Sequence, residues 1–137
     1  MGLARQDVLS VLGIYIQAWE QQDPDLIVTI FTEGATYHER VLEAPIPDRE
    51  AIRAYWEFKV VGSQANIRCK LLNLYLDGTT AIAGWEAEFD DVAAGVGKRM
   101  REIAVLVFED GLIVSLREYW ASEQVGELSA APADAWR

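Results

Sequence analysis

The sequence has one cysteine, one histidine and no long hydrophobic run. Cys69 alone cannot build a disulfide framework or a cysteine-based zinc site, and no pair of histidines offers metal ligands, so we expect no bound metal. No stretch of about 18 consecutive apolar residues could span a membrane, and no charged-then-apolar leader opens the chain. These absences predict a cytoplasmic protein that does not contact a membrane.

Basic residues are also scarce, since 12 Lys and Arg stand against 22 Asp and Glu and give a net charge of −10. Nucleic-acid binding needs a clustered basic surface that neutralises phosphates, and no such cluster is present. The sequence also lacks a glycine-rich phosphate loop, a dinucleotide fingerprint and a nucleophile elbow. We therefore expect no nucleic-acid partner and no cofactor, so that any chemistry is done by side chains alone.

What the chain does have is a high apolar content, with 51% hydrophobic residues in a length of 137. A chain of this size buries about two thirds of the surface that its unfolded form exposes, which suffices for one core with a pocket in it. We expect a single domain over residues 1–122. Residues 123–137 are rich in Ala and Pro and are expected to form a loosely held tail.

Helical spacing dominates the first half of the chain. Val8, Leu12, Tyr15 and Trp19 form one apolar stripe, which predicts a helix over residues 4–22. Two further helices are expected where an aspartate can act as N-cap. They are a helix from Asp23-Pro24 to about Phe31, followed by a short strand over residues 35–39, and a helix from Asp48 to about Val61.

From Asn66 onward the apolar period changes from helical to alternating, which indicates an antiparallel meander. The expected strands are Asn66–Leu76, Thr79–Asp90, Lys98–Phe108 and Leu112–Ser122. Both faces of these strands carry bulky apolar residues, so helices should close the concave face of a curved sheet and another subunit should cover the convex face. We expect a homodimer with Trp85 and Phe89 at that convex interface.

Short motifs within residues 5–122 resemble marks of one fold superfamily. They are Tyr15-Ile16-Gln17-Ala18-Trp19, Asp23, Phe31, Ala35-Thr36-Tyr37-His38-Glu39, Ala51-Ile52-Arg53, Tyr55-Trp56, Phe108-Glu109-Asp110-Gly111-Leu112-Ile113 and Tyr119-Trp120. With this order of elements, the chain resembles SnoaL-like polyketide cyclases and ketosteroid isomerases of the nuclear transport factor 2-like fold. The resemblance implies an α+β cone, in which a mostly antiparallel sheet wraps around about three helices. It predicts the fold rather than the reaction, because this superfamily includes isomerases, cyclases, dehydratases, epoxide hydrolases and non-catalytic proteins.

The comparison with ketosteroid isomerases implies roles for single residues. Tyr15 and Glu39 keep the spacing of that family's first-helix tyrosine and catalytic aspartate, which makes Glu39 the candidate base and Tyr15 the donor to an enolate oxygen. An apolar cavity would raise the pKa of such a base toward neutrality. The family's second donor falls on Ala104, and Glu102 on the same face is the candidate second acid. The expected pocket walls are Trp56, Trp120, Met100, Leu106 and Ile82.

Three glutamates of the sheet form a second candidate cluster. If the hairpins close with an even register sum, Glu86 lies opposite Glu102, and Glu102 opposite Glu118. Like charges in such a row repel, so at least one of the acids should be protonated or paired with a cation, and could serve as a general acid or bind ligand. The alternative is a solvated row at the pocket mouth, and the alternative for Glu39 is an ion pair with Arg40 or Arg49.

His38 is a further candidate ligand contact, because its charge changes near neutral pH. Strand alternation points it away from Glu39, however. The residues favour a cofactor-independent isomerase, cyclase or dehydratase that acts by proton transfer on a small, partly apolar carbonyl compound. The alternatives are a non-catalytic module that binds a small molecule or dimerises, and a protein-recruiting module that uses the sheet.

Overall fold

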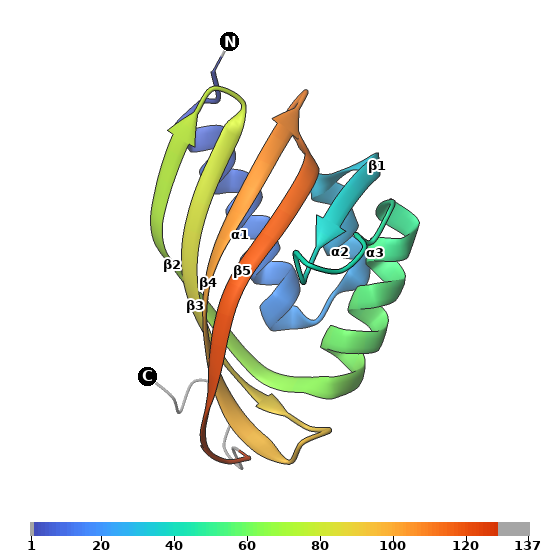
Figure 1. Cartoon of the computed structure of the whole chain (residues 1–137), viewed down its shortest axis with the longest axis vertical. Helices are drawn as coiled ribbons and strands as arrows, with labels where there is room; N and C mark the ends of the chain where they lie inside the picture. Colours follow the sequence, from blue (N-terminus) through green and yellow to red (C-terminus); the bar gives the residue numbers. More distant parts are fainter. Residues whose placement is uncertain (1, 129–137) are drawn as a thin grey trace.

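The computed structural model describes residues 2–128, which form three α-helices and a five-stranded sheet. The helices are α1 (Arg5–Gln21), α2 (Pro24–Ile27) with the 3-10 turn η1 (Val28–Ile30), and α3 (Arg49–Trp56) with the π-helical turn η2 (Glu57–Val61); the strands are β1 (Phe31–His38), β2 (Gln64–Asp77), β3 (Thr80–Asp91), β4 (Val96–Glu109) and β5 (Leu112–Glu127). The helices cover one face of the curved sheet (Figure 1). The predicted α+β class is confirmed.

The sheet has the strand order β1-β5-β4-β3-β2. The four long strands form the expected antiparallel meander, and β1 alone runs parallel to its neighbour β5. This mostly antiparallel sheet curves around α1 (Figure 1), which agrees with the predicted cone.

Both aspartate caps are present. The Asp23 side chain accepts hydrogen bonds from the backbone N–H of Asp25 and Leu26, and Asp48 accepts one from Ala51. The predicted helix from Asp23-Pro24 to about Phe31 is present as α2 and the 3-10 turn η1, which ends at Ile30. The strand β1 begins at Phe31, four residues before its predicted start, because Phe31 already pairs with Ile113 of β5.

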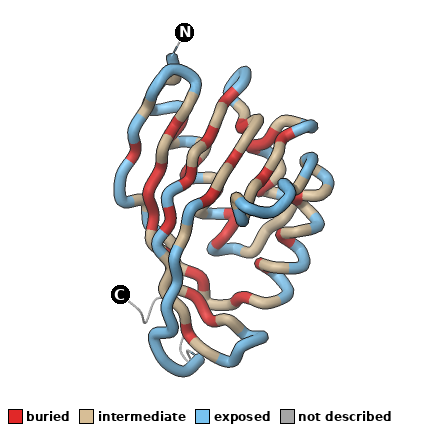
Figure 2. The backbone as a smooth tube through the Cα atoms, viewed as in Figure 1, coloured by how far each residue is buried: buried red, intermediate tan, exposed pale blue. Residues whose placement is uncertain are grey.

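Buried residues alternate with less buried ones along most of β3 and the second half of β4 (Figure 2), and the buried set makes up the face that meets the helices. Trp85 and Phe89 belong to this face, with 1% and 3% of their surface exposed. The ring of Trp85 lies 4.9 Å from that of Tyr15, and the ring of Phe89 lies 6.4 Å from that of Trp19. Their predicted place on the convex face is therefore wrong, because they pack in the core against α1.

The register of β3 and β4 also differs from the prediction. The four residues Val92 to Gly95 connect these strands, which places Trp85 opposite Glu102 and Glu86 opposite Arg101. A shift of one residue moves every side chain of a strand to the other face. Glu86 therefore lies on the convex face, where it pairs with Arg101 at 2.9 Å, and the predicted row of three acids is wrong.

The last strand continues to Glu127, five residues beyond its predicted end at Ser122, because Glu123 and Gln124 still pair with β4. Residues 123–127 thus belong to the sheet and not to a tail, and the rest of the expected tail from residue 129 lies outside the described residues. None of the helices described within residues 2–128 is long and apolar enough to cross a membrane.

Candidate active site

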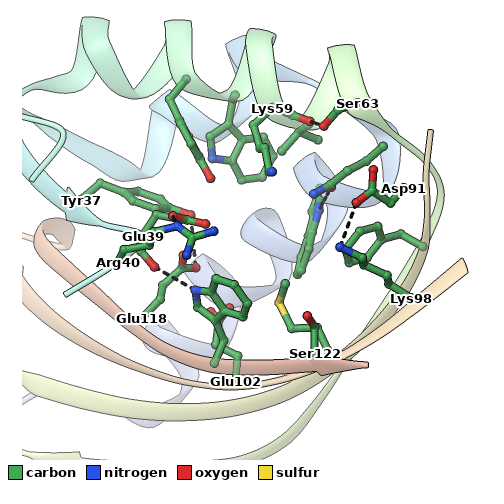
Figure 3. A pocket seen from close by; sticks show the side chains of 18 of the residues that line it. Tyr37, Glu39, Arg40, Lys59, Ser63, Asp91, Lys98, Glu102, Glu118 and Ser122 are labelled. Carbon is green, nitrogen blue, oxygen red and sulfur yellow. Dashed lines mark hydrogen bonds and ion pairs between the residues drawn. The ribbon is translucent and has the colours of Figure 1, made fainter. Parts of the chain in front are cut away.

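A cavity of about 110 Å³ lies between the helices and the concave face of the sheet, and it is partly open to solvent. A buried water needs roughly a tenth of that space, so a small molecule fits. The lining residues come from α1, β1, α3, η2 and all strands from β2 to β5 (Figure 3). They are Tyr15, Trp19, Tyr37, Glu39, Arg40, Tyr55, Trp56, Lys59, Val60, Ser63, Gln64, Phe89, Asp91, Lys98, Met100, Glu102, Glu118, Trp120 and Ser122.

Two buried glutamates, Glu102 of β4 and Glu118 of β5, form a carboxyl pair in this lining, with 5% and 6% of their surface exposed. They lie on the same face at diagonal positions, since Glu102 is opposite Trp120 and Glu118 is opposite Ala104. A bulge at Val107 and Phe108 shifts the register of this hairpin by one residue, so that both acids face the helices.

Two tyrosine hydroxyls contact the carboxyl pair at Glu118. Tyr15 donates to Glu118 Oε2 at 3.0 Å, and Tyr37 donates to the same oxygen at 3.2 Å. The two hydroxyl oxygens are also 3.0 Å apart. Three close oxygens can share three hydrogen bonds only if three protons are present, and the tyrosines supply two. All three hydrogen bonds among these oxygens can therefore form when Glu118 is protonated. When Glu118 is ionised, the two tyrosine hydroxyls still donate to its carboxylate.

Burial displaces the pKa values of these groups upward, because it disfavours each charged form. For Glu102 the pKa lies well above its ordinary value, first through burial and then through the charge of Glu118. Burial raises the pKa of Glu118 from 4.5 to about 7, although hydrogen bonds, including those from the two tyrosines, oppose the shift. Burial is also the main cause that raises the pKa values of Tyr15 and Tyr37. Burial thus favours the neutral form of Glu102, and Glu118 can take up or release a proton near neutral pH.

Glu39 follows directly after β1 at the mouth of the cavity. Its carboxylate pairs with Arg40 Nε at 3.2 Å, and its backbone oxygen accepts a hydrogen bond from Trp120 Nε1 at 2.9 Å. The Arg40 guanidinium lies over the Trp120 ring, 5.1 Å from the ring centre. One ion pair and one indole thus bound this mouth. Arg40 is one of the two partners that the alternative interpretation of Glu39 predicted.

Two of the three lysines in the chain line the opposite side of the cavity (Figure 3). Lys98 Nζ pairs with Asp91 Oδ2 at 2.9 Å, and Lys59 of η2 lies nearby. We call Lys59, Asp91 and Lys98 the lysine cluster. Gln22 anchors the backbone here, because its side chain donates to the oxygens of Val60 at 2.8 Å and Gln64 at 2.6 Å.

Comparisons with known proteins place this arrangement in a family. The family model for SnoaL-like domains matches residues 14–116, which is well over half of the chain. This chain belongs to the SnoaL-like domain family. The fold of the SnoaL-like domain is also that of a solved LEH-like epoxide hydrolase from M. tuberculosis, with a TM-score of 0.69, 14% sequence identity, and coverage of 85% of this chain and 84% of that one. No curated protein matches the sequence.

Most of the predicted site residues meet in the cavity of this SnoaL-like domain. Its lining includes Tyr15, Glu39, Glu102, Trp56, Trp120, Glu118 and Met100. Four predicted contacts lie elsewhere. Glu86 and Ile82 share the convex face of β3, and Leu106 is fully buried in the core between Ala81 and Leu116. His38 does not line the cavity, because strand alternation turns it to the side of β1 opposite Tyr37.

Sequence reasoning missed Tyr37 and the lysine cluster. Strand alternation carried a signal for Tyr37, because it stands two residues before Glu39 and shares its face. Helical spacing carried a signal for Lys59. It lies four residues after Tyr55 and three after Trp56, which places all three side chains on one helix face. No local pattern pointed to Asp91 or Lys98, since both stand beside a turn. Within residues 2–128, no three His, Cys, Asp or Glu side chains are grouped so that they could hold a metal ion.

Proposed function

We propose that this SnoaL-like domain is a cofactor-independent proton-transfer enzyme that acts on a small, partly apolar carbonyl compound in the cavity. The carboxyl pair beside Tyr15 and Tyr37 carries this proposal. It combines a base whose pKa of about 7 suits neutral pH with a neutral acid, inside one wall of the cavity. Aromatic side chains and Met100 supply the apolar surface around the ligand.

In the proposed step, ionised Glu118 removes a proton from the carbon next to the carbonyl group. The C–H bond breaks, its electrons form the enolate, and the proton passes to the Glu118 carboxylate. Tyr15 and Tyr37 hold this carboxylate in place through their two hydrogen bonds. Glu102, as a neutral acid, donates a hydrogen bond to the enolate oxygen. Its Oε2 atom has no other partner within residues 2–128.

The fate of the enolate decides the reaction class. Return of the proton to another carbon gives an isomer, loss of a β-hydroxyl group gives a dehydrated product, and attack on a second carbonyl closes a ring. Isomerase, cyclase and dehydratase chemistry thus share the same first step. Glu39 remains the base implied by the family resemblance, but its ion pair with Arg40 holds it at the mouth, so we assign the first proton transfer to Glu118.

Two measurements test this proposal. Carboxyl NMR titration should show one glutamate that titrates near pH 7 and disappears in Glu118→Gln. In D₂O, the protein should speed deuterium exchange next to the carbonyl group of cyclohexanone or cyclohexenone, and Glu118→Gln should reduce that rate by roughly 10² to 10⁴-fold. Glu88→Gln, on the convex face beside Arg99, is the matched control and should keep the full rate.

The same experiments can contradict the proposal. If Glu39→Gln abolishes exchange while Glu118→Gln does not, the base is Glu39. If no carboxyl group titrates above pH 5.5 or so, the buried pair lacks the pKa values that the mechanism needs. Either result removes Glu118 from its proposed role.

A further inference from the structure

The charges in the cavity lining do not balance locally. Seven lining residues are Asp, Glu, Lys or Arg. Four of them form two ion pairs, Arg40 with Glu39 and Lys98 with Asp91. What remains is the carboxyl pair on one side and Lys59 on the other. Within residues 2–128, the Lys59 ammonium makes no ion pair within 4.0 Å, although its side chain is half-buried.

Lys59 is oriented toward the cavity by its own turn and by its neighbours. It belongs to η2, whose backbone is held by Gln22, and its carbonyl accepts a hydrogen bond from Ser63. Its side chain extends toward the cavity beside Asp91 and Lys98 (Figure 3). The lysine cluster therefore contains two cations and one anion, which leaves one positive charge in excess at this side.

We propose that Lys59 binds the carboxylate of an anionic ligand and thereby fixes the direction in which the ligand enters the cavity. One excess positive charge matches one carboxylate, and charge-assisted hydrogen bonds from a half-buried ammonium favour it over a neutral group. The ligand is then a small organic acid whose carboxylate is separated by an apolar spacer from a carbonyl group. This inference deepens the proposed function, on which the role of the carbonyl group rests.

The opposite side of the cavity enforces this direction. Glu39 and Glu118 lie together there, away from the lysine cluster (Figure 3). The charge of Glu39 is balanced by Arg40, so it is ionised Glu118 that would repel a ligand carboxylate. The apolar surface between the two sides comes from Trp19, Trp56, Phe89 and Met100. A ligand carboxylate at Lys59 therefore places the far end of the ligand at the carboxyl pair, where proton transfer is proposed.

The test measures binding alone, with two probes that differ in charge and hardly in shape, namely hexanoate and hexanamide. Titration calorimetry should show that the unmodified protein prefers hexanoate. Lys59→Met should weaken hexanoate binding by about tenfold or more, as expected for the loss of a hydrogen bond to a charged group, and leave hexanamide binding nearly unchanged. Lys59→Arg should restore the preference. Lys70→Met, an exposed lysine on the sheet, is the matched control and should change neither affinity.

Three outcomes overturn the inference. They are binding of neither probe, equal binding of both probes by the unmodified protein, and equal loss of both affinities in Lys59→Met, which would show a structural role only. The proposed function is tested separately. If it holds, Glu118→Gln loses deuterium exchange of a neutral ketone without losing the preference for hexanoate, whereas full exchange in this variant contradicts the proposed function and leaves the role of Lys59 standing. A protein that keeps this preference but never exchanges deuterium would be an organic-acid binder without the proposed chemistry.

Discussion

At the scale of single residues, Glu118 connects the stability of the protein with its chemistry. It is buried against Tyr15 and Tyr37, so its negative charge is less favourable in the folded chain than in the unfolded one. The same displaced pKa that suits a base at neutral pH therefore destabilises the fold once the group is ionised. Active sites commonly keep such groups at a cost in stability.

The pH dependence of unfolding should report this cost. The folded-state pKa of Glu118 is raised from 4.5 to about 7, so the folded chain holds more protons than the unfolded chain across that window. The free energy of unfolding should therefore fall as pH rises from 4.5 through 7, by up to about 3 kcal/mol, and the raised pKa of Glu102 should add a fall of the same sign.

Urea denaturation at a series of pH values measures this effect. Glu118→Gln, which cannot ionise, should be more stable than the unmodified protein at pH 8 and should show a smaller fall between pH 4.5 and 7. An identical slope in both proteins would mean that Glu118 titrates at its ordinary value when folded.

The sequence identified many of the residues that line the cavity but not their contacts with one another. Tyr15 and Glu39 were paired by spacing, yet the hydroxyl of Tyr15 contacts Glu118, and Glu39 contacts Arg40. These partners are distant along the chain, and no local pattern encodes a contact across 103 positions. Trp56 and Trp120 do line the cavity, as the family resemblance implied; Trp56 ends α3, whereas Trp120 lies within β5, opposite Glu102.

At the scale of elements, the turns that begin helices are well determined by local chemistry. Asp23 and Asp48 were predicted as caps, and both accept the expected backbone hydrogen bonds. The cap at Asp48 also matters for the site, because α3 carries Trp56 and continues into η2 with Lys59.

Removal of this cap should loosen α3 without altering the carboxyl pair. Asp48→Ala should lower the free energy of unfolding by about 1 kcal/mol, because a backbone N–H at the helix start loses its acceptor. Asp48→Ser or Asp48→Asn, which can accept the same hydrogen bond from Ala51, should recover most of the loss in urea denaturation. Equal destabilisation by all three variants would assign the effect to the charge of Asp48 instead.

Hairpin register shows where element-level prediction fails. The strands themselves were found from alternation, but their facing residues depend on the number of residues in a turn and on a bulge. The four-residue connection between β3 and β4 moved Glu86 to the convex face, and the bulge in the next hairpin kept Glu118 on the concave one.

At the scale of the whole molecule, the convex face of the sheet still carries exposed apolar side chains. Leu72 of β2, Ile103 of β4 and Tyr119 of β5 are 43%, 42% and 47% exposed and line one shallow groove, with Gly84 of β3 between Leu72 and Ile103. Since Trp85 and Phe89 are in the core, these three residues become the candidates for the homodimer interface expected from the sequence. An exposed apolar patch of this kind is more typical of a contact surface than of free solvent-facing sheet.

We predict that the unmodified protein is a dimer in light scattering or analytical ultracentrifugation. Ile103→Lys should shift it toward monomer with little change in unfolding behaviour, whereas Trp85→Ala should lower the free energy of unfolding by about 3 to 5 kcal/mol through loss of core packing. A monomeric unmodified protein, or a dimer that Ile103→Lys leaves intact, would contradict this interface.

The amino-acid sequence by itself determined the elements of this protein: the apolar stripe of α1, the two aspartate caps, the alternating strands and the α+β family to which they belong. Those features depend on contacts between near neighbours in the chain, which local periodicity records. Only the tertiary structure decided which acids share the cavity, that Glu86 does not, and that Lys59 faces them from the opposite side. Strand register and the packing of η2 against the sheet depend on turns, a bulge and distant contacts, and none of these leaves a periodic trace in the sequence.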